Sequence, residues 1–123
     1  MEEIIRLHLQ AALAAVAVDW NLSPQGADAP RVVLYRISVT GDIIADGDSG
    51  LRRARVQADC FAATYKAARD LAKSAITALN GWRDGNTILG VFLDAVRDLP
   101  PETGTGETLG RVSVDFFINY QEF

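Results

Sequence analysis

Few residues in this chain have side chains that could do covalent or metal chemistry. It contains one histidine, His8, and one cysteine, Cys60. A nucleophilic site needs a nucleophile beside a base, and a zinc site needs about four ligands of these types. His8 lies on the polar side of a predicted helix, where a surface histidine is the simpler interpretation. Cys60 faces the apolar side of a predicted strand, which favours a buried thiol that packs as a small hydrophobic residue.

The glycine-rich segment 104–106 is the other motif that could hold a ligand. Phosphate-binding loops follow a strand, begin a helix and carry a lysine, and the patterns around this Gly-Thr-Gly segment predict none of these features. We interpret it as a linker and expect no catalytic residue, no metal site and no cofactor. An enzyme is therefore the weakest functional class for this chain.

A row of arginines is a stronger candidate for a binding surface. Alternation places the row on the outer face of the predicted strands, interspersed with Asp59 and Asp115. Its members are Arg36, Arg53, Arg55 and Arg111. One interpretation is a solvated sheet face with cross-strand ion pairs, each worth about 0.2 to 1 kcal/mol. The other is a contact surface for a partner, because arginine is enriched at interfaces. The sequence leaves both interpretations open.

A strand followed directly by a helix must position most of these side chains. Polar and apolar residues alternate in Arg53–Cys60, which predicts a strand with one buried face. After Phe61 the period changes to that of a helix. The pattern predicts an alanine-rich amphipathic helix from near Thr64 to Asn80-Gly81.

The remaining elements follow from the same patterns. We expect a first helix over residues 2–17 and strands over 31–40, 88–95 and 111–120. Residues 98–110 should form a long flexible loop, and 41–50 either a second long loop or an extension of flexible strand ends. The element order α-β-β-α-β-β indicates one α+β domain, residues 1–123, with two helices on one face of a four-stranded antiparallel sheet. A crossover helix makes the second and third strands parallel. The fourth strand should therefore lie between them, in the order 1-2-4-3.

The third predicted strand suggests an assembly surface. It is apolar on both faces and lies at an edge of the sheet, with Ile88 and Phe92 outward beside Phe117 of the fourth strand. An exposed apolar edge is an aggregation hazard unless a partner covers it. The alternative is that Trp82 or the first helix covers these side chains within one subunit.

Composition limits the partners. A net charge of −4 and a pI near 4.8 argue against a protein whose main task is gripping nucleic acid. The chain has no apolar run that approaches the roughly 18 residues of a membrane span, so we expect no membrane partner.

One stretch, Ser49–Leu79, carries a family resemblance. In it a Ser-Gly-Leu triplet precedes a strand that ends in Asp-Cys-Phe-Ala, and Thr-Tyr and an alanine-rich helix follow. The residues are Ser49, Gly50, Leu51, Val56, Gln57, Asp59, Cys60, Phe61, Ala62, Thr64 and Tyr65. This pattern resembles the signature of the tail-completion, or tail-terminator, proteins of long-tailed bacteriophages, prophages and gene-transfer-agent-like particles. Arg111–Phe116, with Tyr120, is similar to the last strand of that family, so the resemblance covers most of the chain.

The resemblance implies a non-enzymatic virion structural protein. Members of the family form a ring, expected here to be a hexamer, that caps the tail tube and takes part in head-tail joining. The expected partners are further copies of the chain, the tail tube protein and the head-completion or connector protein. DNA would pass through the ring without specific binding. The protein would be assembled in the bacterial host cytoplasm and would reside in the virion tail. The alternative is a small α+β ligand-binding or regulatory module, which would need a concave pocket with convergent polar groups.

In this interpretation the two long loops line the ring's opening or contact a partner. Their candidate residues are Asp42, Ile43, Ile44, Asp46, Asp48, Glu102 and Glu107. An acidic lining would repel phosphates and let the genome slide past. The glycine and acidic content of both loops predicts that they are mobile in the free protein and become ordered on assembly.

Overall fold

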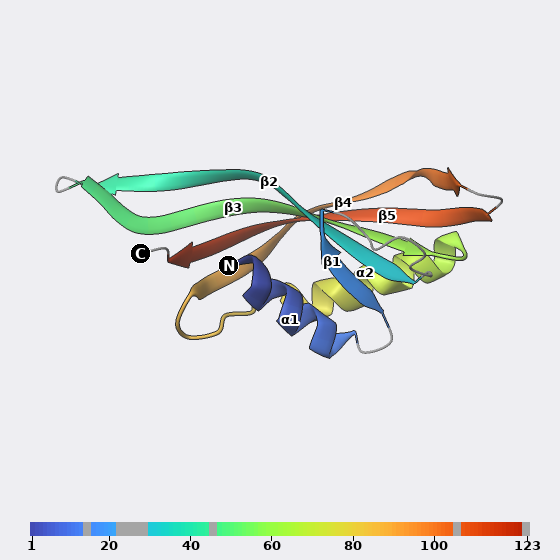
Figure 1. Cartoon of the computed structure of the whole chain (residues 1–123), viewed down its shortest axis with the longest axis horizontal. Helices are drawn as coiled ribbons and strands as arrows, with labels where there is room; N and C mark the ends of the chain where they lie inside the picture. The colour runs from blue at the N-terminus through green and yellow to red at the C-terminus, as the bar shows by residue number, and fades with distance from the viewer. Residues whose placement is uncertain (14–15, 22–29, 45–46, 105–106, 122–123) are drawn as a thin grey trace.

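The computed structural model describes residues 1–13, 16–21, 30–44, 47–104 and 107–121. In chain order its elements are α1 (Glu2–Ala12), β1 (Ala17–Trp20), β2 (Arg31–Ile44), β3 (Gly47–Ala62), α2 (Tyr65–Leu79), β4 (Ile88–Gly104) and β5 (Glu107–Gln121). The strands form one twisted sheet in the order β1-β2-β3-β5-β4, and both helices lie on the same side of it (Figure 1). The α+β class and the relative order of the four expected strands are confirmed.

The sheet has a fifth strand, so the prediction of a four-stranded antiparallel sheet was wrong. β1 pairs with β2 in parallel, which makes the sheet mixed. The first helix ends at Ala12 rather than continuing to residue 17. Gln10 stabilises the reversal, because its side-chain amide donates to the carbonyls of Leu13 and Val16 and accepts from the N–H of Val18. The β-branched Val16 and Val18 suit an extended chain better than a helix.

The two predicted loops are the far ends of two long β-hairpins. Ile43 pairs with Asp48 at the end of β2–β3, and Thr103 pairs with Thr108 at the end of β4–β5. The loop prediction was wrong for 98–110, and for 41–50 the structure has the alternative, an extension of the strand ends. Glycines and acidic residues are poor strand formers by composition, but cross-strand backbone hydrogen bonds do not depend on side-chain type. The hairpins extend from opposite ends of the sheet (Figure 1).

The core lies between the helices and one face of the sheet. α2 lies against β3 and β5, and its buried alanines permit a close approach. It begins after Thr64, whose hydroxyl accepts from the N–H of Ala67, and ends at Leu79 with Asn80 as its C-cap, as predicted. α1 lies against β1 and α2. Trp20 packs at the margin of the core and donates from Nε1 to the carbonyl of Glu2. The opposite face of the sheet carries no helix among the described residues, and we call it the open face.

Candidate functional site

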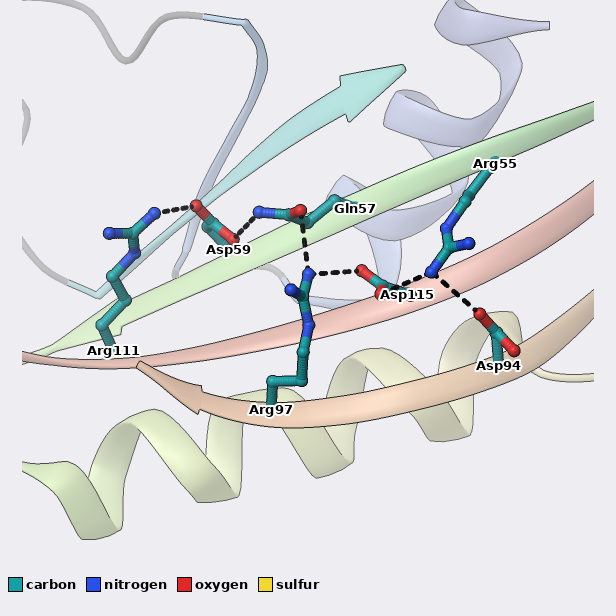
Figure 2. Close-up of polar contacts among 7 residues, drawn as sticks. All are labelled: Arg55, Gln57, Asp59, Asp94, Arg97, Arg111 and Asp115. Carbon is teal, nitrogen blue, oxygen red and sulfur yellow. Dashed lines mark hydrogen bonds and ion pairs between the residues drawn. The ribbon is translucent and has the colours of Figure 1, made fainter. Parts of the chain in front are cut away.

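The most developed polar arrangement in the described part of the chain lies on the open face (Figure 2). We call it the open-face network; its members are Arg55, Gln57, Asp59, Asp94, Arg97, Arg111 and Asp115. They come from three neighbouring strands, β3, β5 and β4. Two of them are buried acids, since the side chains of Asp59 and Asp115 are 0% and 4% exposed.

Each buried acid has two donors. Asp115 accepts from Arg55 at 3.3 Å and from Arg97 at 3.1 Å. Asp59 accepts from Arg111 at 2.6 Å and from Gln57 at 2.8 Å. Because these charges are matched by charge-assisted hydrogen bonds, burial of the carboxylates does not leave them uncompensated.

Two further contacts join the pairs into one network. Arg55 also reaches Asp94 at 3.2 Å, and Gln57 accepts from Arg97 at 3.0 Å. The network holds three arginines and three aspartates, so its charges cancel. This arrangement favours the interpretation of a sheet face with cross-strand ion pairs for Arg55 and Arg111. It does not resemble a free basic patch that would grip a polyanion.

Sequence reasoning missed Arg97, Asp94 and Gln57 as members of this network. Membership of the network depends on the strand register. This register places Gln57 of β3 opposite Asp115 of β5, and Arg97 of β4 opposite Ser113 of β5. An irregularity between Leu93 and Ala95 lets Asp94 reach Arg55. Register across strands that are distant in sequence is not visible in the alternation of a single strand.

Arg36 does not belong to the arginine row on the open face. It forms an ion pair with Glu2 of α1 at 2.7 Å, on the helix-bearing side of the sheet. It pairs with Val56, whose side chain is in the core. A β-bulge between Arg36 and Ser38 reverses the alternation of inward and outward side chains along β2. Residues from Ser38 onward face the side that the sequence pattern predicted, whereas Arg36, before the bulge, faces the opposite side.

Arg53 remains on the open face, next to an aromatic pair. Its guanidinium lies 5.2 Å from the centroid of the Phe117 ring, and that of Arg55 lies 5.8 Å from it. Phe92 is the cross-strand neighbour of Phe117 and is 50% exposed. The Phe92 ring also lies over Gly90, where an added Cβ would come within 2.9 Å of it. Phe92 and Phe117 therefore lie side by side on the open face, and their role in assembly stays a prediction.

Ile88 is not part of that patch. It is fully buried in the core opposite Tyr120. An irregularity between Ile88 and Gly90 reverses the alternation within β4, so Ile88 and Phe92 face opposite sides. β4 has three further exposed apolar residues that the alternation did not predict, Leu89, Leu93 and Val96. Leu93 and Val96 lie at the margin of the helix-bearing face.

The candidate loop residues lie on the two hairpins. Asp42, Ile43 and Ile44 belong to β2, and Asp48 belongs to β3. Glu102 belongs to β4 and Glu107 to β5, at the opposite end of the sheet (Figure 1). Asp46 lies outside the described residues. The structure therefore does not bring the two acidic groups together within one subunit.

A groove of about 490 Å³ lies near the base of the β2–β3 hairpin. Leu51 and Leu89 line it, together with Arg53 and Asn119. Arg53 donates to the side-chain oxygen of Asn119 at 3.2 Å, so these two polar groups bind each other rather than converge on the groove. Within the described ranges, no group of three or more histidine, cysteine or acidic side chains is placed to hold a metal ion. None of the described helices is both long and apolar enough to cross a membrane.

The lone cysteine is buried as predicted, whereas the lone histidine is not a free surface residue. Burial raises the pKa of the Cys60 thiol to about 12, and the Asp59 carboxylate adds to the rise. His8 is partly buried because α2 packs beside α1: its Nε2 donates to the carbonyl of Ala78 at 2.9 Å. Its ring stacks on Trp82, with centroids 3.8 Å apart. Trp82 thus packs beside the core and on α1.

Comparison with known proteins finds likeness to solved structures but not to sequence families or curated proteins. No protein-family model matches the chain, and no curated protein matches it. A chain from the solved structure "Virion of native gene transfer agent (GTA) particle" is similar, with a TM-score of 0.65 and 15% sequence identity. The two chains share a fold. The match covers 92% of this chain and 84% of the virion chain, so the likeness extends over nearly the whole domain.

Proposed function

We propose that this protein is a non-enzymatic structural component of a phage-like virion and acts as a tail terminator. Copies of the chain form a ring, a hexamer, on the end of the tail tube. The ring stops tube polymerisation and offers a surface to the head-completion or connector protein. It is assembled in the bacterial host cytoplasm and resides in the virion tail.

The observation that carries this proposal is the fold shared with a gene transfer agent virion chain over most of both chains. The resemblance of Ser49–Tyr65 and Arg111–Phe116 to the tail-terminator signature adds the specific role within the virion. The open-face network supports a scaffold rather than a reaction centre, because each of its acids is bonded to an arginine of the same network.

The position of the two hairpins supports a subunit that contacts different partners at its two ends. They project from opposite ends of the sheet (Figure 1). Between Ile37 and Leu51, and between Asp98 and Gly110, the sequence contains no lysine or arginine. We therefore assign one hairpin of each subunit to the ring's opening, where its acids repel phosphates and let DNA slide. The other hairpin reaches a neighbouring virion protein.

Negative-stain imaging of the purified protein, alone and mixed with its tail tube protein, tests the proposal. We expect rings, and tubes that carry a ring at one end and stop growing. Duplex DNA should show no measurable binding at physiological salt, because the acidic hairpins repel it. Tubes that stay uncapped at every protein ratio would overturn the tail-terminator role, and micromolar DNA binding that is lost as salt rises would overturn the acidic lining.

A further inference from the structure

The outer edge of β2 is free along one segment. β1 pairs with β2 only from Arg31 to Leu34. Beyond it, at 36–41, no strand of the described residues lies on the outer side of β2, and every residue of this segment is exposed. We call 36–41 the β2 free edge. It includes Ile37, 54% exposed, and Val39, 38% exposed.

The outer edge of β4 is protected at both ends but not in the middle. At its start, the chain after α2 covers it: the N–H of Gly81 donates to Val91, and the N–H of Leu93 donates to the side chain of Asn80. Near its end, Pro100 and Pro101 remove two N–H donors, a common way to block strand addition. Residues 94–99 lie between these protections. We call 94–99 the β4 free edge.

The two free edges are complementary in direction. Each neighbouring pair in the series β2-β3-β5-β4 is antiparallel, so β4 runs antiparallel to β2. A second copy placed beside the first in the same orientation would bring its β2 against the first copy's β4 as an antiparallel pair, which a sheet accepts readily.

The free edges are also complementary in their apolar side chains. Val39 lies opposite Ala54, and Val96 lies opposite Val114, so both valines lie on the helix-bearing face. Val96 is 49% exposed. Joining the edges would place the two valines side by side and extend the apolar rows of both copies through the junction. Exposed apolar edges of this kind are otherwise a hazard for an isolated subunit.

We infer that the subunits of the ring join by antiparallel pairing of the β2 free edge of one copy with the β4 free edge of the next, with Val39 opposite Val96. The occupant of each edge is therefore a second copy of this chain. The inference rests on the proposed ring. The contact is head-to-tail, and such contacts close into rings when the rotation between copies allows it.

The position of the free edges also sets the tilt of the strands. The β2 free edge lies toward the β2–β3 hairpin, and the β4 free edge lies toward the β4–β5 hairpin, at the other end of the sheet (Figure 1). Neighbouring copies must therefore be displaced along the strand direction. A closed ring accommodates a constant displacement only if its strands are tilted from the ring axis, as in a β-barrel.

Cysteine cross-linking tests the contact, because the native Cys60 is buried and does not compete. With Val39 opposite Val96, residues 40 and 95 become direct neighbours on the open face. The double variant Thr40→Cys with Ala95→Cys, oxidised in the presence and absence of tail tube protein, should give a ladder of covalent oligomers. Either single variant alone should stay monomeric on a denaturing gel, and a mixture of the two should stop at dimers. The double variant Thr77→Cys with Ala95→Cys, which moves one thiol to the exposed side of α2, should give no ladder.

A second pair of variants measures the contact without oxidation. Val39→Lys should abolish rings, because it places a charge in the apolar junction. Leu7→Lys, at a leucine of α1 that is 54% exposed, should leave ring formation unchanged. Rings without a ladder, or dimers of one single variant, would overturn the edge contact and leave the proposed function intact. Absence of rings in the unmodified protein, with tubes uncapped, would overturn the proposed function and the contact together.

Discussion

Gly110 allows α2 to approach the sheet, and its replacement by alanine should destabilise the fold. The residue lies on β5 opposite Ala62, beside the start of α2. A Cβ at this position would lie 2.6 Å from the carbonyl carbon and oxygen of Thr64 and from the nitrogen of Tyr65. These are backbone atoms, so no side-chain rotation can relieve the contact. Either the first turn of α2 or the strand must move.

The expected size of the effect comes from two opposing terms. Overpacking in a well-packed region costs about 1 to 3 kcal/mol. The reduced conformational entropy of the unfolded alanine variant offsets about 0.4 to 1 kcal/mol. Because the contacts at 2.6 Å are with backbone atoms, the cost should lie in the upper half of that range, about 2 to 3 kcal/mol. We expect a net loss of about 1 to 2.5 kcal/mol for Gly110→Ala, which corresponds to a fall in Tm of about 3 to 12 °C in a domain of this size.

Gly41→Ala is the matched control for this measurement. Gly41 also lies in a strand, but a Cβ there would first meet the end of the Arg52 side chain, at 3.3 Å. That side chain can shift, so the change in the free energy of unfolding should stay within about 0.5 kcal/mol. Urea unfolding of both variants, followed by circular dichroism, measures the difference. Equal midpoints for the two variants would refute the argument that the β5–α2 approach depends on glycine.

Three further predictions follow from the open face and the core. Asp115→Asn should lower the free energy of unfolding in urea by about 1.5 to 3 kcal/mol, because it neutralises a buried acid that has two arginine partners. Asp94→Asn is the control: this acid is partly exposed and has one arginine partner, so the loss should be about 1 kcal/mol or less. Phe92→Ser should change the Tm of the monomer by only a few degrees, because the Phe92 side chain is half exposed. It should nevertheless abolish tube capping in negative-stain images. Capping at the normal level would exclude the Phe92 side chain from the assembly surface. The Cys60 thiol should react with a disulfide reagent at pH 8 only as fast as the protein unfolds. Burial raises the pKa of the folded Cys60 thiol to about 12, whereas the unfolded thiol has a pKa near 9. The preference of the fold for the neutral thiol therefore adds its full stability below pH 9, and this stability is lost as pH rises from 9 toward 12. Fast labelling of the native protein would contradict the buried assignment.

Local pattern was sufficient for the elements whose neighbours in sequence are also their neighbours in space. The alternation of Arg53–Cys60 and the helical period after Thr64 predicted β3 and α2, and Asn80-Gly81 predicted the end of the helix. The order of the four expected strands also followed from the sequence. A crossover helix makes the strands on either side of it parallel, and only one position for the last strand keeps every adjacent pair antiparallel.

Tertiary structure decided which way individual side chains face and how far the strands extend. A bulge adds one residue to one strand, so every side chain on one side of it faces the sheet surface opposite to the one that alternation predicts. Bulges of this kind place Arg36 beside α1 and Ile88 in the core. Long-range backbone pairing likewise extended β2–β3 and β4–β5 through segments whose composition predicted loops, because each hydrogen bond depends on the opposite strand. The open-face network has the same origin. Its arginines and aspartates were visible as residue types, but Arg97 reaches Asp115 only because the register of β4 against β5 brings two segments of the chain side by side, and no pattern within either segment contains that register.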